Sequence, residues 1–174
     1  RAGGCGSVAA RAADAMALHT QRAASSEQRA VLQLRERPSC HDMHWTERPG
    51  YAGTAIFSRR PLQVLHHGIA EGPDPEGRVL RVDIDGVDLV SVYLPSGSSN
   101  DAAQARKEVW MNQFSPWMAT IKRRRRPVLV GGDLNIARDE GDIYHWKGNL
   151  KNSGFLPHER KWMNGLVASG WVWL

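Results

Sequence analysis

The sequence predicts an α/β fold, and three features of the chain support that prediction. Apolar residues alternate with polar ones in short segments between residues 54 and 93, as is typical of β-strands. An Asp-Gly pair joins two of these segments, which indicates a β-hairpin. Helical patterns lie on both sides of a further apolar segment, 128–130. Strands and helices in this order indicate an α/β protein with a mixed sheet.

The composition is that of a globular protein. The chain has 174 residues, of which 41 % are hydrophobic and 24 % charged. No apolar run approaches the ~20 residues of a membrane span, and no secretory signal stands at the start. The net charge of +5 favours a polyanionic partner. Cys5 and Cys40 lack metal-type spacing and are interpreted as free thiols in a reducing compartment. We expect a soluble, cytoplasmic monomer without a membrane partner.

Residues 1–44 differ from the rest of the chain. They are rich in Ala and Arg and show neither a clear strand nor a clean helical stripe. A helix at 9–18 is compatible with its Ala, Met and Leu residues, which are good helix formers. We therefore predict a divergent N-terminal segment of uncertain fold, 1–44, followed by a single, incomplete domain, 45–174.

Three strands are predicted in the first half of that domain. The first covers 54–58 and is bounded by Gly53 and Pro61. The second is a half-buried strand in which Leu80, Val82 and Ile84 alternate with charged residues. It turns through Asp85-Gly86 into a third strand, 87–93, because a type I′ turn needs positive φ at both central residues.

Two helices and one strand are predicted in the second half. Asn100 or Asp101 caps the first helix, and Pro116 is expected to kink or split it. A buried strand at 128–130 ends at Gly131-Gly132. The last helix begins near Pro157 and stops at Gly170. Residues 171–174 read as the start of a further apolar strand, so we expect the chain to be a fragment.

The strongest functional signal follows the strand at 128–130. Asp133 and Asn135 stand two positions apart, so in a continuing strand their side chains share a face at its carboxyl end, where α/β sheets place their sites. A carboxylate there can take a proton from water or hold a hard cation, and the amide can orient water or a phosphate oxygen. The alternative is a turn in which Asp and Asn bond to their own backbone.

Three further groups have both a functional and an ordinary interpretation. Tyr93 ends a strand, where its phenol can donate to a phosphate oxygen or simply pack in the core. The basic run 122–126 is a solvated helix end or a DNA contact. The polar segment 147–155 is a phosphate-binding loop or an ordinary solvated one. Its candidate DNA contacts are Lys147, Asn149, Lys151 and Asn152.

Several motifs, in their order, resemble the exonuclease III family of the endonuclease/exonuclease/phosphatase superfamily. The resemblance covers about residues 45–172. Asn-Ser-Gly-Phe-Leu-Pro-x-Glu-Arg, at its distance after Gly-Asp-x-Asn, is specific to the DNA-repair nuclease branch. The matching segments are 50–55, 74–78, 92–97, 132–137, 142–143, 147–149 and 152–160.

The resemblance implies a partial four-layered α/β sandwich with two mixed β-sheets. It implies that Asp133 positions or deprotonates the attacking water, that Asn135 orients water or phosphate, and that Tyr93 stabilises charge on phosphorus. Mg²⁺, or alternatively Mn²⁺, is implied as the cofactor, with Asp133 and Asn135 as ligands. Asn149 and Asn152 match amides that contact the DNA backbone. Glu76 and Arg78 match residues that hold structure near the site.

The chain departs from the family pattern in two places. Leu32-Gln33 is followed by Leu34 where the family has a metal-binding Glu, and Glu36 stands two positions too late. The later Ser-Asp-His segment, which carries the catalytic His, is absent. Residues 1–44 thus look divergent or misread, and we expect the chain alone to fold poorly or to be inactive because exposed sheet edges invite aggregation.

The sequence therefore predicts a DNA-repair phosphodiesterase, a 3′→5′ exonuclease and abasic-site endonuclease whose partner is double-stranded DNA with abasic sites or 3′ ends. One alternative is a non-catalytic DNA-binding remnant, which the missing Glu and His favour. Another is a phosphoesterase of the same superfamily that acts on lipid or inositol phosphates.

Overall fold

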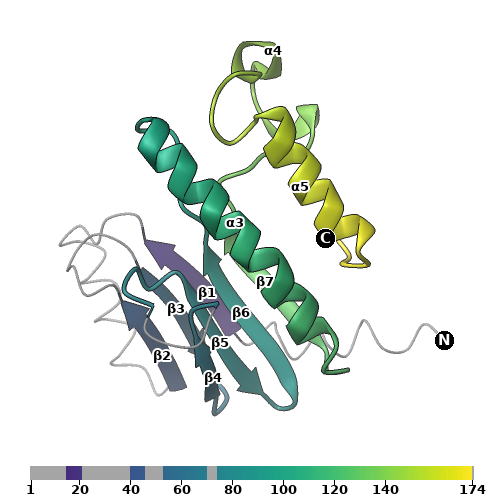
Figure 1. Ribbon diagram of the computed structural model, residues 1–174. Coiled ribbons are helices and arrows are strands. Elements are labelled where there is room, and N and C mark those ends of the chain that lie inside the picture. Colours follow the sequence, from purple (N-terminus) through teal and green to yellow (C-terminus); the bar gives the residue numbers. More distant parts are fainter. Residues whose placement is uncertain (1–14, 21–39, 46–52, 70–73, 174) are drawn as a thin grey trace. The chain divides into compact units, whose positions relative to one another are not determined.

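The computed structural model describes residues 15–20, 40–45, 53–69 and 74–173 (Figure 1). These residues pack into two compact units. The sheet unit comprises the described residues up to Tyr93 together with Trp117–Asp133. The helical unit comprises Leu94–Pro116 and the residues from Leu134 onward. No helix in the described part is long and apolar enough to cross a bilayer.

A three-stranded antiparallel sheet forms one layer of the sheet unit. Its central strand β3 (Gly53–Ser58) is flanked by β1 (Ala15–Thr20) and β2 (Cys40–Trp45). The predicted strand at 54–58 is confirmed. The helix considered at 9–18 is wrong over 15–18, because pairing with β3 outweighs a weak helix propensity there, and 9–14 lie outside the described residues. The strands at 15–20 and 40–45 were not predicted.

A four-stranded sheet forms the other layer, with the strand order β4-β5-β6-β7. The strands are β4 (Gln63–His67), β5 (Val79–Ile84), β6 (Val87–Tyr93) and β7 (Val128–Asp133). Only β6 and β7 run parallel, so this sheet is mixed as expected, whereas the three-stranded sheet is wholly antiparallel. Asp85 has φ 51° and Gly86 φ 82°, which confirms the predicted hairpin turn. Strand β4 was missed.

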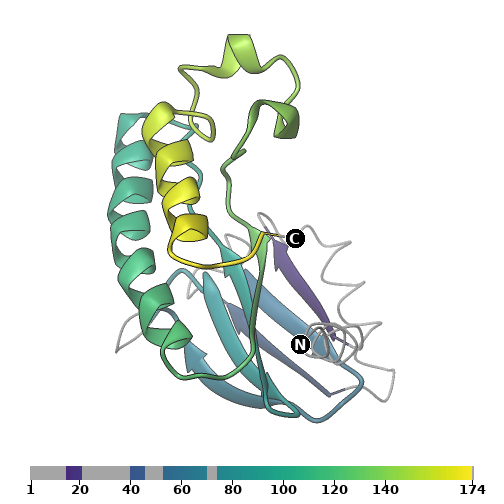
Figure 2. The same ribbon diagram turned by 90° about the vertical axis from the view of Figure 1, so that its right-hand side faces the viewer.

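The two sheets face each other across an apolar core (Figure 2). Ile56 of β3 meets three side chains of β5, which are Leu80, Val82 and Ile84. Each of these four is at most 1 % exposed. Burying a side chain of this size stabilises a fold by about 1.5–3 kcal/mol, so this cluster fixes which face of each strand looks inward.

In two parts of the sheet unit, the burial of side chains differs from what the sequence predicts. Arg81 is 3 % exposed although it stands at a polar position of β5, because its guanidinium bonds to the fully buried Asp88 of β6. The apolar residues 128–130 are only partly exposed rather than buried, since β7 is the last strand of its sheet in the described chain. Residues 122–126 are exposed, and Arg126 forms ion pairs with Asp83 and Asp88.

Helix α3 (Asp101–Lys122) begins at a side-chain cap, because Asn100 Oδ1 accepts a hydrogen bond of 2.8 Å from the backbone N–H of Ala103. The expected split at Pro116 does not occur, since the helix runs through that residue. Helix α5 (Pro157–Ala168) confirms the last predicted helix. Trp162 Nε1 of α5 donates to the Met111 carbonyl of α3 at 3.2 Å. In the sequence, two short turns of helix separate β7 from α5: η1 (Glu140–Asp142) and α4 (Trp146–Asn149).

Candidate active site

Tyr93 and Asp133 are neighbours across the parallel strand pair of the sheet unit. Each is the last residue of its strand, and the two are register partners. Residues aligned in this way project to the same side of a sheet, so the phenol and the carboxylate share one face at the carboxyl end. Tyr93 is 7 % exposed, whereas Asp133 is partly exposed. The structure therefore brings together two of the three predicted catalytic residues.

The position before Asp133, where β7 lies against β6, accepts only glycine. Gly132 has φ 134°, and a Cβ atom at this position would lie 2.0 Å from the Val92 carbonyl oxygen. Real Cβ atoms do not approach backbone that closely, so only glycine fits here. A Cβ atom at Gly131 would meet no atom within 4 Å, so of these two neighbouring glycines Gly132 is the restricted one.

Arg78 contacts both the backbone and the ring of Tyr93. The Arg78 Nη1 donates to the Tyr93 carbonyl oxygen at 3.2 Å, and the Tyr93 N–H donates to the Arg78 carbonyl oxygen at 2.8 Å. The guanidinium carbon lies 4.9 Å from the centroid of the Tyr93 ring. Glu76 accepts a hydrogen bond from Arg78 Nε. These contacts agree with the structural role expected for Glu76 and Arg78.

Asn135 is held by contacts of the helical unit. It lies beyond the end of β7 and has φ 48°, so the alternation of a strand does not extend to it. Its Nδ2 donates to the Leu94 carbonyl at 2.7 Å, and its own carbonyl accepts a hydrogen bond of 2.9 Å from Lys107 Nζ. Asn135 is therefore set by its own turn and not by the face of the strand that carries Asp133.

A buried ion pair contacts the turn that contains Asn135. Lys107 of α3 and Glu159 of α5 are 2.6 Å apart, and neither side chain has exposed surface. Glu159 Oε2 also accepts hydrogen bonds from the backbone N–H groups of Gly154 (2.7 Å) and Leu156 (3.1 Å). The pair thus ties together α3, α5 and the two turns that contain Asn135 and Gly154.

Sequence reasoning missed Lys107, although one signal pointed to it. Lys107 falls on the apolar stripe of α3, three residues before Trp110 and seven before Phe114, where solvated lysines are not expected. A lysine on such a stripe needs a buried partner. Glu159, in the Pro-His-Glu-Arg segment, is that partner.

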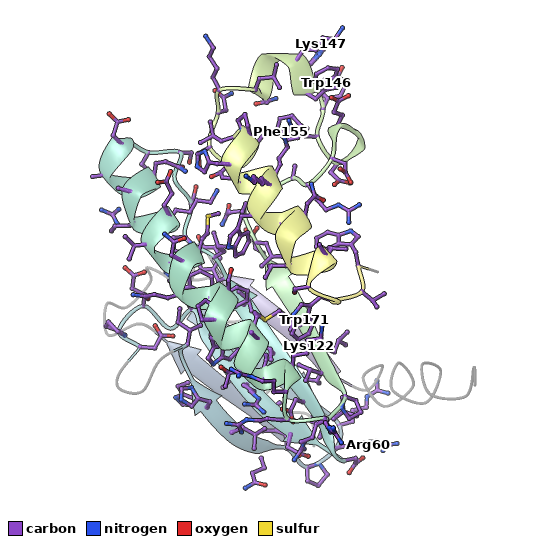
Figure 3. All side chains as sticks on the ribbon, turned by 45° about the vertical axis from the view of Figure 1, so that its right-hand side comes forward. Arg60, Lys122, Trp146, Lys147, Phe155 and Trp171 are labelled. Carbon is purple, nitrogen blue, oxygen red and sulfur yellow. The ribbon has the colours of Figure 1, made fainter. Side chains whose placement is uncertain are left out.

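The loop that carries the candidate DNA contacts is organised by its own amides. Asn149 Nδ2 donates to the carbonyls of Tyr144 (3.1 Å) and His145 (3.2 Å), and Asn152 Nδ2 donates to Asn149 Oδ1 at 2.9 Å. Lys147 and Lys151 are exposed. Figure 3 shows Lys147 and Trp146 on this loop. In this structure the two amides bind the loop itself, and the two ammonium groups face solvent.

The described side chains meet only part of what a divalent cation requires. Asp133 supplies one carboxylate, the hard oxygen ligand that such cations take. Within the residues described, no three His, Cys, Asp or Glu side chains are grouped closely enough to hold a metal ion. The segment around Leu34 and Glu36, which the family resemblance singled out, lies outside them.

Comparison with known proteins gives consistent matches. The sequence profile described as "Endonuclease/Exonuclease/phosphatase family" matches residues 9–173. The chain is 30 % identical over 139 residues to an exodeoxyribonuclease of Bacillus subtilis, covering 78 % of this chain and 55 % of the relative. It is 32 % identical over 127 residues to the DNA repair nuclease APEX1 of Danio rerio, covering 72 % and 41 %. The chain thus spans about half the length of these relatives.

Solved structures show the same fold. An AP endonuclease from Archaeoglobus fulgidus superposes with a TM-score of 0.78 at 19 % identity, covering 91 % of this chain and 61 % of that one. A 3′-5′ exonuclease from Neisseria meningitidis superposes with a TM-score of 0.74 at 25 % identity, covering 95 % and 66 %. These similarities confirm the expected α/β fold.

Proposed function

Because the chain belongs to the endonuclease/exonuclease/phosphatase family, we propose that it is a DNA-repair phosphodiesterase, with 3′→5′ exonuclease and abasic-site endonuclease activity. The single observation that carries the proposal is the register pairing of Tyr93 with Asp133 at the carboxyl end of the mixed sheet. The names of the relatives, an exodeoxyribonuclease and a DNA repair nuclease, support DNA as the substrate.

In the proposed reaction, a water oxygen attacks phosphorus and the bond from phosphorus to O3′ breaks. Asp133 accepts a proton from the attacking water, and Asn135 orients the water or a phosphate oxygen. Tyr93 donates a hydrogen bond to a phosphate oxygen as negative charge builds there. The departing O3′ takes up a proton, so that the products are a 5′-phosphate and a 3′-hydroxyl.

A divalent cation is part of the proposal. Family members are generally metal-dependent, and we take Mg²⁺ as the ion, with Mn²⁺ as the alternative. Asp133 and Asn135 are the proposed ligands, of which Asp133 supplies the carboxylate. When bound, the cation would act as a Lewis acid on the phosphate.

Double-stranded DNA with an abasic site or a 3′ end is the proposed partner. The net charge of +5 and the exposed Lys147 and Lys151 suit a phosphate backbone. Asn149 and Asn152 are the other proposed contacts, which in the free protein organise the loop. Such a substrate places the proposed enzyme, a monomer, in the compartment that holds the DNA, which is the cytoplasm in a bacterium.

An incision assay tests this function. A 5′-labelled duplex with one tetrahydrofuran abasic site is incubated with the full chain in Mg²⁺, in Mn²⁺ and in EDTA. We expect a product cut at the abasic site, with a 3′-hydroxyl, that forms with metal and not with EDTA. Because the sequence predicts an impaired enzyme, we expect the product to form far more slowly than with a full-length family member. Binding of the duplex without incision in either metal would instead indicate a non-catalytic DNA-binding protein. Faster hydrolysis of inositol phosphates than of DNA would indicate another phosphoesterase.

A further inference from the structure

The loop before α5 presents an aromatic ring to solvent. Tyr144 is 83 % exposed, the largest exposure among the large hydrophobic residues described. The His145 ring lies against it, with centroids 4.0 Å apart and an interplanar angle of 58°. Because so much of the Tyr144 side chain is exposed, most of its ring surface is available to stack on another flat group.

The backbone presents this ring in a fixed way. His145 has φ 52° and ψ 45°, a left-handed conformation that residues other than glycine rarely adopt. Asn149 Nδ2 donates to the carbonyls of Tyr144 and His145, and the Gly148 N–H donates to the His145 carbonyl at 2.9 Å. Strained conformations persist where the surroundings over-determine them, and they gather at binding sites.

The chemistry beside the ring suits a nucleotide. Lys147 is exposed, and its ammonium lies 5.4 Å from the centroid of the Trp146 ring (Figure 3). Ammonium groups attract phosphates, and aromatic faces stack on nucleobases of any sequence. Within a duplex the faces of paired bases are covered by their neighbours. An unpaired base is therefore the part of DNA that offers a free face to Tyr144.

We propose that Tyr144, supported by His145, stacks on an unpaired nucleobase of the bound DNA, while Lys147 contacts a nearby phosphate. This proposal rests on the proposed function, because that function supplies DNA as the partner. In this proposal, Asn149 and Asn152 hold the loop that presents the ring. Tyr144 then makes the protein favour DNA with an unpaired base over a fully paired duplex.

Fluorescence anisotropy tests the proposal with two labelled duplexes, one blunt and one with a single unpaired nucleotide at its 3′ end. EDTA is present so that no hydrolysis occurs. We expect Tyr144→Ala to weaken binding of the duplex with the unpaired nucleotide by about tenfold, and binding of the blunt duplex much less. Tyr144→Phe, which keeps the ring, should bind both duplexes as the unaltered protein does. The matched control is Val109→Ala, which shortens an exposed apolar side chain (58 % exposed) on a different element, α3.

Equal binding by Tyr144→Ala and the unaltered protein, or an equal loss on both duplexes, would overturn the stacking role. If the unaltered protein still incises abasic DNA in that case, this inference alone fails. If the unaltered protein binds neither duplex, the proposed function fails and the stacking role falls with it.

Discussion

Lys107 and Glu159 form an ion pair of 2.6 Å in which neither side chain has any exposed surface. Lys107 reaches from α3 to the carbonyl of Asn135, and Glu159 reaches from the first turn of α5 to the N–H groups of Gly154 and Leu156. The turn that holds a proposed catalytic amide is thus fixed by charges that water does not reach.

Breaking this pair should destabilise the protein strongly. Lys107→Met leaves the Glu159 carboxylate buried without its cation, and losing one partner of a buried pair costs about 3–5 kcal/mol. Urea unfolding measures this free energy, and Lys161→Met, at an exposed position of α5, is the matched control. The double variant Lys107→Met/Glu159→Gln should be destabilised by less than the sum of the single variants. A loss below about 1 kcal/mol for Lys107→Met would show that the pair is not what holds the turn.

Gly132 should tolerate no side chain. Gly132→Ala places a Cβ atom against the Val92 carbonyl and must push β7 away from β6, so we expect a loss of at least about 2 kcal/mol in unfolding free energy. Gly131→Ala adds the same methyl group next to it, where nothing lies within 4 Å, and should change stability by under about 1 kcal/mol. Similar melting temperatures for the two variants would contradict the close approach of the strands.

Two aspartates allow a comparison of a buried and an exposed ion pair. Asp88→Asn removes the charge that balances Arg81, whose side chain is 4 % exposed, and should cost about 3 kcal/mol or more. Asp85→Asn breaks a pair with Arg60 in which both side chains are nearly half exposed, so it should cost at most about 1 kcal/mol. Thermal unfolding of both variants measures the difference. Equal losses would mean that Asp88 does not serve as the counter-charge of Arg81.

The lysines of the loop should act through phosphate contacts. We expect Lys147→Ala and Lys151→Ala each to weaken DNA binding and to lower the slope of log affinity against log salt by about one. Anisotropy titrations from low to moderate salt give this slope, and Lys161→Ala on α5 is the control. A variant that weakens binding without changing the slope would place its lysine away from the phosphates.

Local signals predicted part of this fold well. Asp85-Gly86 between two alternating segments indicated the hairpin, and Pro157 marked the first residue of α5, because each of these features depends on residues close in the sequence. Strands β1 and β2 depend on pairing with β3, so their own residues carried little signal. β4 was missed for the same reason, since its place comes from its pairing with β5.

The candidate site was predictable to a similar extent. The ends of two predicted strands pointed to Tyr93 and Asp133, and the register of β6 and β7 places them together. The contacts of Asn135, Lys107 and Glu159 could not be predicted, because they join residues more than 20 positions apart. The exposure of Tyr144 also needed the structure, since a tyrosine in a loop packs inward as readily as it faces solvent.

The most direct test of the account is the single-turnover incision rate of abasic duplex DNA by four proteins: the unaltered chain, Tyr93→Phe, Asp133→Asn and the double variant. We predict losses of about 10²- to 10⁴-fold for Asp133→Asn and about 10²- to 10³-fold for Tyr93→Phe, with DNA affinity retained. The double variant should be little slower than Asp133→Asn, because the two groups act on one phosphate. Incision at the unaltered rate by both single variants would contradict the assignment of these two residues to the active site.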